Sequence, residues 1–422
     1  MIDLKCGEKS YPVEIAPEHV LSVLRPRIGA AAGSPAELIE RALDDCAEPL
    51  SRFRPGEQVV IVTSDVTRPT GSDIYLPLLV ARLNAAGVRD RDIEIVIALG
   101  IHRKQTEAEH RKIVGELYGR IRVTDHDCDD TGALVYLGDT ARGIPVEVNR
   151  RVAEAKRLIL TGAVTFHYFA GFGGGRKSLL PGVSSRRSCM ASHFALLNQG
   201  EGSGRHPKAV TGNLEGNPVH EAMLEACAMR PPDFILNTVL APDKRILAAF
   251  AGEWRSAHLE GCRFYADAFS HPITERADLV VVSCGGFPKD INLIQAHKSM
   301  EYASRALKPG GVMILLAECR DGYGNATFFN WFRYQSCGEL ESALRKRYEI
   351  NGQTAWSVKE KAERFRIVLV SQLPPEEVAA MGMIAAETLQ QAFVQAQPML
   401  PEGFRAYVIP EGGIVLPVLE GR

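Results

Sequence analysis

The sequence lacks the features that mark disulfide-rich, membrane and nucleic-acid-binding proteins. Its nine cysteines include no CxxC pair, which indicates reduced thiols rather than a disulfide framework or a thiolate zinc site. With 49 basic and 51 acidic residues, the net charge of −2 offers no basic surface for nucleic acid or an anionic membrane. No apolar run reaches membrane-spanning length, and the first residues do not resemble a signal peptide. We therefore expect a cytoplasmic protein with a small-molecule partner.

Two common nucleotide-binding motifs are also missing. No GxGxxG with a following acidic residue comes after the first expected strand, which argues against an ordinary dinucleotide fold. A P-loop needs glycine, four residues and then Gly-Lys-Ser/Thr, but counting from Gly171 the second glycine position holds Arg176. ATP hydrolysis is therefore not expected, although the Lys177-Ser178 pair leaves phosphate contact possible.

Apolar runs rich in Val and Ile alternate with helical patterns, which is typical of α/β domains with mostly parallel sheets flanked by helices. Strands are expected at 58–62, 92–98, 157–162, 278–283 and 312–316, and helices at 72–86, 106–117 and 254–270. The length of 422 residues allows two domains. We predict an N-terminal cofactor-binding α/β domain over 1–270 and a C-terminal α/β domain over 271–404, with the last segment, about 405–422, able to return to the first.

Most of the chemistry lies in the stretch 167–183 and shortly after it. It contains His167, the glycines Gly173, Gly174 and Gly175, and Lys177, and His193 follows. Glycine lets backbone N–H groups approach an anion closely, because it reaches positive φ at little cost. The stretch predicts a phosphate-like cradle, and the alternative is a glycine-rich surface turn with a solvated lysine.

Polar residues follow two of the expected strands. Asp65 and Arg68 come after the strand at 58–62, and His102 comes after the strand at 92–98. Both sites lie at the carboxyl ends of strands, where open α/β sheets bind ligands. Arginine binds carboxylates and histidine is suited to acid–base work near neutral pH. The alternatives are a capping Asp with an exposed Arg and an incidental loop histidine.

The second half of the chain offers one further set of candidates. Asn292, Gln295 and Lys298 recur at helical spacing, so they either reach a ligand or form a solvated polar stripe. Trp356 either walls a pocket or packs in a core.

Taken together, these motifs resemble the nickel-dependent lactate racemase family over nearly the whole chain. The resemblance implies a nickel ion held by a pincer mononucleotide, a modified pyridinium with thioamide and thiocarboxylate arms. Lys177 would carry it covalently and His193 would be the protein ligand of the metal. His102 and His167 match the paired acid–base histidines. The cofactor side is matched by Asp65, Gly173, Gly174, Gly175 and Ser178, and the substrate side by Arg68, Gln295, Lys298 and Trp356.

The resemblance also implies the reaction. It is inversion of the C2 carbon of a 2-hydroxy acid by hydride transfer, in a cleft between the two domains, after maturation by pincer-synthesising enzymes. A nickel pincer needs one imidazole and no metal cage of protein ligands.

Two departures leave the substrate open. Ile294 stands where lactate-specific relatives are expected to have tyrosine, and Arg186-Arg187 adds positive charge before His193. Lactate, malate and a sugar acid are all candidates, although the arginine pair is better explained as a solvated helix face. Two other functions stay open: a phosphate- or nucleotide-binding transferase that uses Lys177 without nickel, and a small-molecule sensor without turnover.

Overall fold

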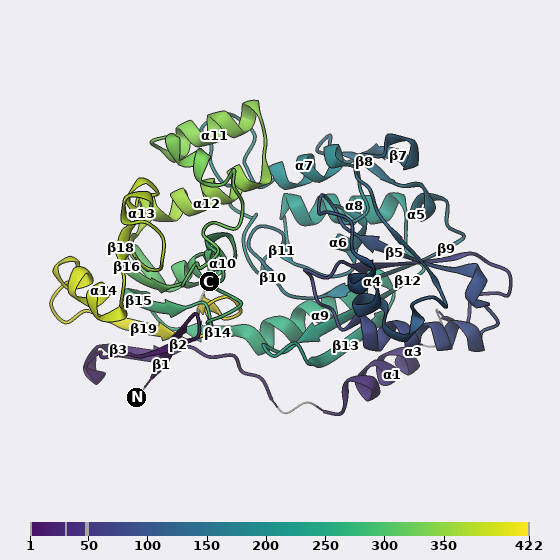
Figure 1. Ribbon diagram of the computed structural model, residues 1–422, viewed down its shortest axis with the longest axis horizontal. Coiled ribbons are helices and arrows are strands. Elements are labelled where there is room, and N and C mark those ends of the chain that lie inside the picture. Colours follow the sequence, from purple (N-terminus) through teal and green to yellow (C-terminus); the bar gives the residue numbers. More distant parts are fainter. Residues whose placement is uncertain (1, 30–31, 47–49, 421–422) are drawn as a thin grey trace. The chain divides into compact units, whose positions relative to one another are not determined.

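In the computed structural model, which describes residues 2–29, 32–46 and 50–420, the chain divides into two compact units. Unit 1 comprises Met1–Ile28, Gln199–Gly204 and Asp267–Arg422, and unit 2 comprises Gly29–Asn198 and Arg205–Ala266. Each unit contains a six-stranded sheet with helices packed on it (Figure 1). The predicted α/β fold class is therefore confirmed.

The sheet of unit 2 has the strand order β13-β12-β9-β4-β5-β6, and its neighbours are parallel except for β12 and β13. Its strands are β4 (Val59–Ser64), β5 (Ile93–Ala98), β6 (Arg122–Asp125), β9 (Arg157–Ala163), β12 (Phe234–Leu240) and β13 (Ile246–Gly252). The strands expected at 58–62, 92–98 and 157–162 correspond to β4, β5 and β9. Their nearly continuous burial is typical of parallel strands covered on both faces.

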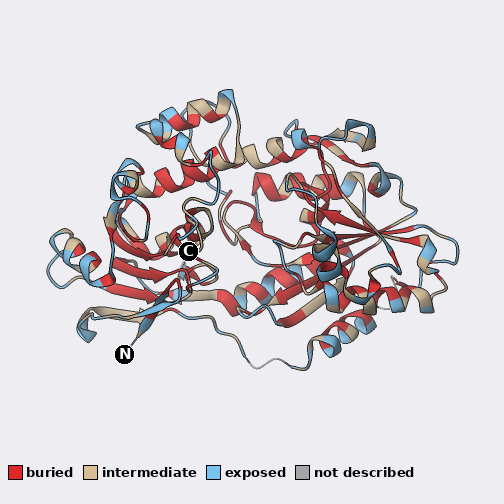
Figure 2. Cartoon of the chain, in the orientation of Figure 1, coloured by how far each residue is buried: buried red, intermediate tan, exposed pale blue. Residues whose placement is uncertain are grey.

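Alternate residues of these strands enter two separate cores, because successive side chains point to opposite faces of a sheet. Val59 and Ile61 join one core, and Val60 and Val62 join the other. The first core includes α1 (Pro35–Asp45), α3 (Ser72–Ala85) and α4 (Glu107–Val114). The second includes α5 (Arg150–Glu154), α6 (Arg176–Leu179), α8 (Pro218–Met229) and the start of α9 (Trp254–Phe269). Figure 2 shows the buried strands between these helices, whose outer faces are exposed.

The strand order of unit 2 reverses beside β4. The chain runs from β4 to β5 and β6 on one side, and returns later to place β9 on the other side of β4. Ligands of open α/β sheets bind at such a switch point, outside the carboxyl ends of the strands. The loops after β4, β5 and β9 are therefore the first place to look for a site.

Unit 1 has an all-parallel sheet with the order β18-β17-β16-β15-β19-β3. Its strands are β3 (Val20–Val23), β15 (Ala277–Ser283), β16 (Leu307–Leu316), β17 (Arg366–Val370), β18 (Ile384–Ala386) and β19 (Ala406–Ile409). α14 (Leu389–Ala396) packs in the core on one face. α10 (Leu293–Ala303) and α12 (Ile350–Arg364) also contact the sheet, and α11 (Cys337–Lys346) and α13 (Pro375–Ala380) complete the helices described in this unit.

Four two-stranded pairs complete the described strands: β1 (Asp3–Cys6) with β2 (Lys9–Pro12), β7 (Leu134–Asp139) with β8 (Pro145–Asn149), β10 (Phe166–His167) with β11 (Gly171–Phe172), and β14 (Ser270–Ile273) with β20 (Leu416–Leu419). All nine cysteines are free thiols. Over the described ranges, no helix has the length and apolarity needed to cross a membrane.

The expected domain division was wrong at both ends of the chain. The N-terminal segment was assigned to the first domain, but β3 pairs with β19 in the sheet of unit 1. The segment 405–422 does not return to unit 2, because β19 lies between β15 and β3 and β20 pairs with β14. The physical reason is that β19 is buried on both faces, so it must occupy an inner position of a parallel sheet.

A hydroxyl network beneath the switch point yields the first prediction. The buried Tyr75 hydroxyl lies 2.8 Å from Thr161 Oγ1, 2.9 Å from Thr63 Oγ1 and 3.0 Å from Thr70 Oγ1. Because Thr161 donates to the carbonyl of Val62, its hydroxyl accepts from Tyr75, and Thr63 and Thr70 donate to Tyr75.

Tyr75→Phe should therefore lower the free energy of unfolding by about 1–3 kcal/mol, because it leaves two buried donors without an acceptor. The measurement is chemical denaturation, with Tyr136→Phe at the 57% exposed Tyr136 as the matched control. Equal stability of the two variants would contradict the assigned role of this network.

Candidate active site

Three loops of unit 2 meet at the carboxyl edge of its sheet. Asp65 follows β4 directly, His102 lies in the loop after β5, and β9 leads through the β10–β11 hairpin into α6. Asp65 Oδ2 lies 2.9 Å from His102 Nδ1. The prediction that the loops after the two strands emerge at the same edge of the sheet is therefore confirmed.

The Asp65 carboxylate is buried and fixed by hydrogen bonds. It is 3% exposed, and Oδ1 accepts the backbone N–H of Thr67 at 2.6 Å. Burial raises the pKa of Asp65, but the hydrogen bonds from His102 and Thr67 outweigh it and bring the pKa below its ordinary value of 3.8. Because an ionised carboxylate only accepts, His102 carries a proton on Nδ1, and Nε2 lies on the opposite side of the ring from Asp65.

The His102 loop is tied to the helix that carries Lys177. Gly100 N–H donates to the carbonyl of Gly182 at 2.8 Å, and Gly182 N–H donates to the carbonyl of Lys177 at 3.0 Å. Two backbone hydrogen bonds thus connect the loop after β5, which carries His102, with α6, which carries Lys177.

His167 and His193 both contact the ring of Phe169. The Phe169 ring meets the His167 ring edge-on at 4.5 Å between centroids, and meets the His193 ring at 5.3 Å. His167 also accepts the backbone N–H of Ala170 at Nδ1, at 3.3 Å. The two histidines therefore share one aromatic neighbour.

His193 is a neutral imidazole with a defined tautomer. It lies near the end of α7 (Arg186–Phe194), and its Nδ1–H donates to the carbonyl of Cys189 at 2.8 Å, which leaves the lone pair on Nε2. Burial and the nearby Lys177 ammonium lower the pKa of His193 to about 4. Burial raises the pKa of Cys189 to about 12, and the Lys177 ammonium opposes this rise in part. The charge of Lys177 therefore acts on two side chains of α7, those of Cys189 and His193.

The glycine run packs tightly instead of forming the expected phosphate cradle. Gly173 N–H donates to Thr165 O at 2.8 Å and Gly175 N–H donates to Asn237 Oδ1 at 2.7 Å, so both are already used within the protein. Gly174 has a φ of +116°, and a Cβ there would lie 2.6 Å from His258. The glycines thus set the path of the chain between β11 and α6. Ser178 is likewise occupied, because its hydroxyl donates to Thr161 O at 2.6 Å.

Arg68 is exposed and donates to the carbonyl of Thr67 at 3.2 Å. Arg186 and Arg187, by contrast, form ion pairs with Asp129 at 2.7 Å and with Glu147 at 3.2 Å. The solvated helix face is therefore the better explanation of the arginine pair.

The remaining candidates lie in unit 1. Asn292 caps α10, and Lys298 Nζ donates to Gln295 Oε1 at 2.9 Å, so the predicted polar face is confirmed. Trp356 in α12 is 2% exposed, which corresponds to the core-packing alternative, and its assignment to substrate contact stays a prediction.

A buried ion pair that the sequence analysis did not identify joins α10 to α12. Glu301 Oε2 and Lys361 Nζ are 2.7 Å apart, and their side chains are 7% and 4% exposed. It connects the helix that carries Gln295 and Lys298 with the helix that carries Trp356. Because charged residues are almost never fully buried unless paired, neither residue could be assigned to the interior before the fold brought the two together.

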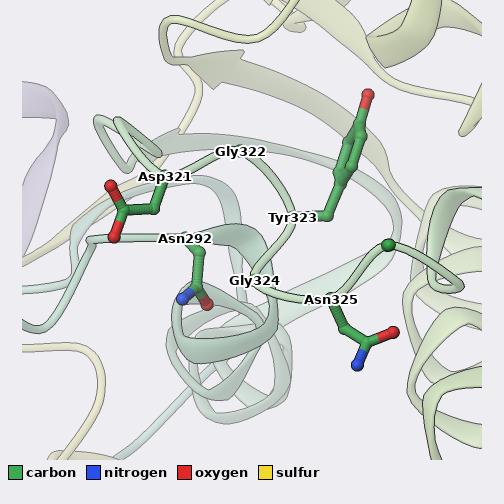
Figure 3. Close-up of a pocket in the computed structure, with 7 residues that line it drawn as sticks. Asn292, Asp321, Gly322, Tyr323, Gly324 and Asn325 are labelled. Atoms are coloured by element: carbon green, nitrogen blue, oxygen red, sulfur yellow. The ribbon is translucent and has the colours of Figure 1, made fainter.

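A shallow hollow of about 500 Å³ lies before α10, and neither Gln295 nor Lys298 lines it. Asn292, Asp321, Tyr323 and Asn325 contribute its polar groups (Figure 3). Tyr323 points away from Asn292 in this view, and its hydroxyl donates to Glu377. None of these side chains is cationic, and Asp321 is acidic.

The fold and the edge of the sheet define an α/β protein with a buried Asp–His pair at a topological switch point. Comparison with known proteins identifies its family. Residues 6–204 match the family model described as the lactate racemase N-terminal domain, and residues 273–416 match the lactate racemase C-terminal domain. The chain belongs to the lactate racemase family, and it is an isomerase of the racemase class.

Individual relatives agree with this assignment. The chain is 31% identical to the lactate racemase of Thermoanaerobacterium thermosaccharolyticum over 98% of both chains. It is 34% identical to the lactate racemase of Lactiplantibacillus plantarum, over 98% of this chain and 99% of the relative.

Solved structures share the fold. The lactate racemase apoprotein from T. thermosaccharolyticum superposes with a TM-score of 0.90 at 31% identity, with 99% of each chain covered. A Thermotoga maritima protein shares the fold at 20% identity, with a TM-score of 0.65 and with 92% of this chain and 99% of its own covered.

The Asp65–His102 pair yields a prediction on pH. The pKa of Asp65 is below 3.8 in the folded protein, so ionised Asp65 stabilises the fold above that value, and the stabilisation is lost as the pH falls through the folded pKa. Asp65→Asn should therefore lower the free energy of unfolding by about 1–3 kcal/mol at pH 7 and by less at pH 3. Denaturation at both pH values tests this, and a penalty that is the same at pH 3 and pH 7 would contradict it.

Proposed function

We propose that this racemase inverts the C2 carbon of a 2-hydroxy acid, with lactate as the first candidate. In this proposal it uses a nickel-pincer mononucleotide attached covalently to Lys177 and ligated through His193. The observation that carries the proposal is the His193 imidazole, whose Nδ1–H is held by Cys189 O at 2.8 Å so that Nε2 remains as a ligand atom. The charge of Lys177 acts on this imidazole. The relatives named lactate racemase match almost the whole chain, which supports the same class of substrate.

The residues present fit such a group. Ni(II) accepts imidazole and sulfur donors in tetragonal geometry, and His193 offers a neutral imidazole whose Nε2 lone pair is available. The hydrogen bond from Nδ1–H to Cys189 O orients the ring, as second-shell partners of metal-bound histidines do. Among the described residues, no three His, Cys, Asp or Glu side chains are placed to hold a metal ion. When bound, the pincer supplies the acceptor and the donor of the hydride exchanged with C2.

His102 and His167 would handle the proton of the substrate hydroxyl. Asp65 holds His102 with Nε2 directed away from the carboxylate, so Nε2 can accept that proton as the hydride leaves and return it afterwards. In the proposal His167 does the same for the mirror-image enantiomer. Two bases are needed because the two enantiomers present the hydroxyl differently relative to the face that loses hydride.

Arg68, Gln295 and Lys298 would orient the substrate, and Trp356 is retained as a proposed substrate neighbour. The exposed Arg68 guanidinium is suited to bind a carboxylate in two parallel hydrogen bonds. The ion pairs of Arg186 and Arg187 do not favour a second carboxylate clamp. Ile294, in place of tyrosine, leaves a larger or more polar acid such as malate or a sugar acid as the other outcome of a substrate screen.

The alternative of a phosphate-binding transferase is weaker. It needs backbone N–H groups of the glycine run for an anion, and those of Gly173 and Gly175 are used within the protein.

Loading of the protein tests the proposal. The chain is produced together with pincer-synthesising enzymes, and intact mass and nickel content are measured. Wild type should carry a nucleotide-sized adduct and about one nickel ion. Lys177→Ala should lose both. His193→Ala should keep the adduct with nickel affinity lowered at least about tenfold.

The matched control is Lys156→Ala, an exposed lysine of the same unit, which should load like wild type. An adduct of unchanged mass on Lys177→Ala would contradict the attachment. Absence of both adduct and nickel from wild type, where a known lactate racemase acquires both, would refute the proposed function.

A further inference from the structure

Arg176, next to Lys177, is the largest fully buried side chain described and has no carboxylate partner. It is 0% exposed, and it forms no ion pair with any residue that the structure describes. Its guanidinium donates instead to Gly173 O, Phe172 O and His220 Nδ1, each at 3.0 Å. Burial lowers the pKa of Arg176 to about 10, which still leaves it cationic at neutral pH.

Two of the three acceptors, Phe172 O and Gly173 O, lie on the segment that leads into α6. Phe172 ends β11, and Gly173 begins the glycine run, so the side chain reaches back over the loop that precedes its own helix. An arginine fork is suited to this task, because its donors hold a fixed planar geometry. The guanidinium therefore joins the end of the hairpin, the glycine run and α8 through His220.

Two further side chains hold the same loop from other elements. His258 of α9 donates Nε2–H to Gly173 O at 2.8 Å, and Asn237 of β12 accepts Gly175 N–H at 2.7 Å. Gly173 O thus receives two donors, one from Arg176 and one from His258. Three elements besides the loop itself fix the position of its backbone.

The histidines must be neutral for this arrangement, and their surroundings keep them so. Burial and then the charge of Arg176 lower the pKa of His220 to about 3 and that of His258 well below its ordinary value. His220 then accepts at Nδ1, and His258 donates at Nε2. The Arg176 cation is therefore stabilised only by neutral hydrogen-bond acceptors. Burying a charge in this way costs free energy, which an apolar side chain of similar size would not.

We propose that Arg176 is a positioning residue that, together with His258, fixes the backbone from which Lys177 is presented toward His193. The inference rests on the proposed function, because it gives Lys177 its reaction with the cofactor. Lys177 N–H donates to Gly174 O at 2.9 Å, so a shift of the glycine run moves the lysine directly. Arg176 itself touches no reacting atom.

The test compares Arg176→Met and Arg176→Lys with a matched arginine. Arg230 also donates to backbone carbonyls, those of Val152, Ala153, Ala155 and Pro231, and lies in the same unit. Two quantities are measured: amide hydrogen exchange over 171–178 in the apoprotein, and the fraction of protein that acquires the adduct on co-production with the pincer-synthesising enzymes.

Arg176→Met should exchange faster over 171–178 and load at least about tenfold less than wild type. Arg176→Lys should lie between the two, because an ammonium restores the charge but not the fork. Arg230→Met should load like wild type even if its melting temperature falls. The proposal would be overturned if Arg176→Met exchanged and loaded like wild type. It would also be overturned if Arg230→Met lost as much loading as Arg176→Met.

A second pair of variants decides the matter if Arg176→Met does not fold. His258→Gln keeps an N–H donor for Gly173 O and His258→Leu does not, so the glutamine variant should exchange more slowly over 171–178 and load better. Equal behaviour of the pair would overturn the proposal. Failure of wild type to acquire the adduct would refute the proposed function instead, while the exchange measurements on the apoprotein would still decide the role of Arg176.

Discussion

The parallel pairing of β4 with β9 is the constraint on which the site of unit 2 depends. Val59 to Val62 pair with Arg157 to Leu160, although the whole β5–β6 excursion separates them in the sequence. Because the strands are parallel, their carboxyl ends meet at one edge. That edge receives the Asp65–His102 pair from one side and the hairpin and α6 from the other. The hydroxyl network around Tyr75 lies beneath this pairing and links the two strands.

The loop after β9 is held by buried polar groups rather than by apolar packing alone. Arg176, His220, His258 and Asn237 make the contacts described above, and the glycines allow the backbone to come this close to them. Such a network is costly unless every member is satisfied, but once satisfied it specifies one conformation. In the proposed function this loop leads to the lysine that carries the cofactor, and catalytic groups tolerate little displacement.

Much of the architecture was predictable because it is local. Alternating strand and helix patterns gave β4, β5, β9, α3 and α9 nearly to the residue, and strand-end logic predicted that Asp65 and His102 emerge at one edge. The N-terminal strand β3 was not predictable, because its partner β19 lies at the other end of the chain and no local pattern encodes that pairing. The glycine run was misjudged for a related reason. Glycine lets another group come close to the backbone. Only the fold shows whether that group is a bound anion or another part of the protein.

His258 shows what a closer sequence analysis could have found. It shares the apolar stripe of α9 with Trp254, Ala257 and Cys262, so its burial follows from helical periodicity. Arg176 gave no comparable signal, because a charged residue in a glycine-rich loop is expected to be solvated. The buried cation becomes visible only when the loop is seen folded onto β12 and α9.

In the proposed function, the two histidines move only the hydroxyl proton, while the hydrogen on C2 travels as hydride and never reaches water. The most direct measurement follows a 2-deuterated hydroxy acid, lactate first, through inversion by the loaded enzyme in ordinary water. The account predicts that the inverted product keeps its deuterium on C2. Replacement of that deuterium by solvent hydrogen at the rate of inversion would show proton abstraction from carbon and would contradict the account.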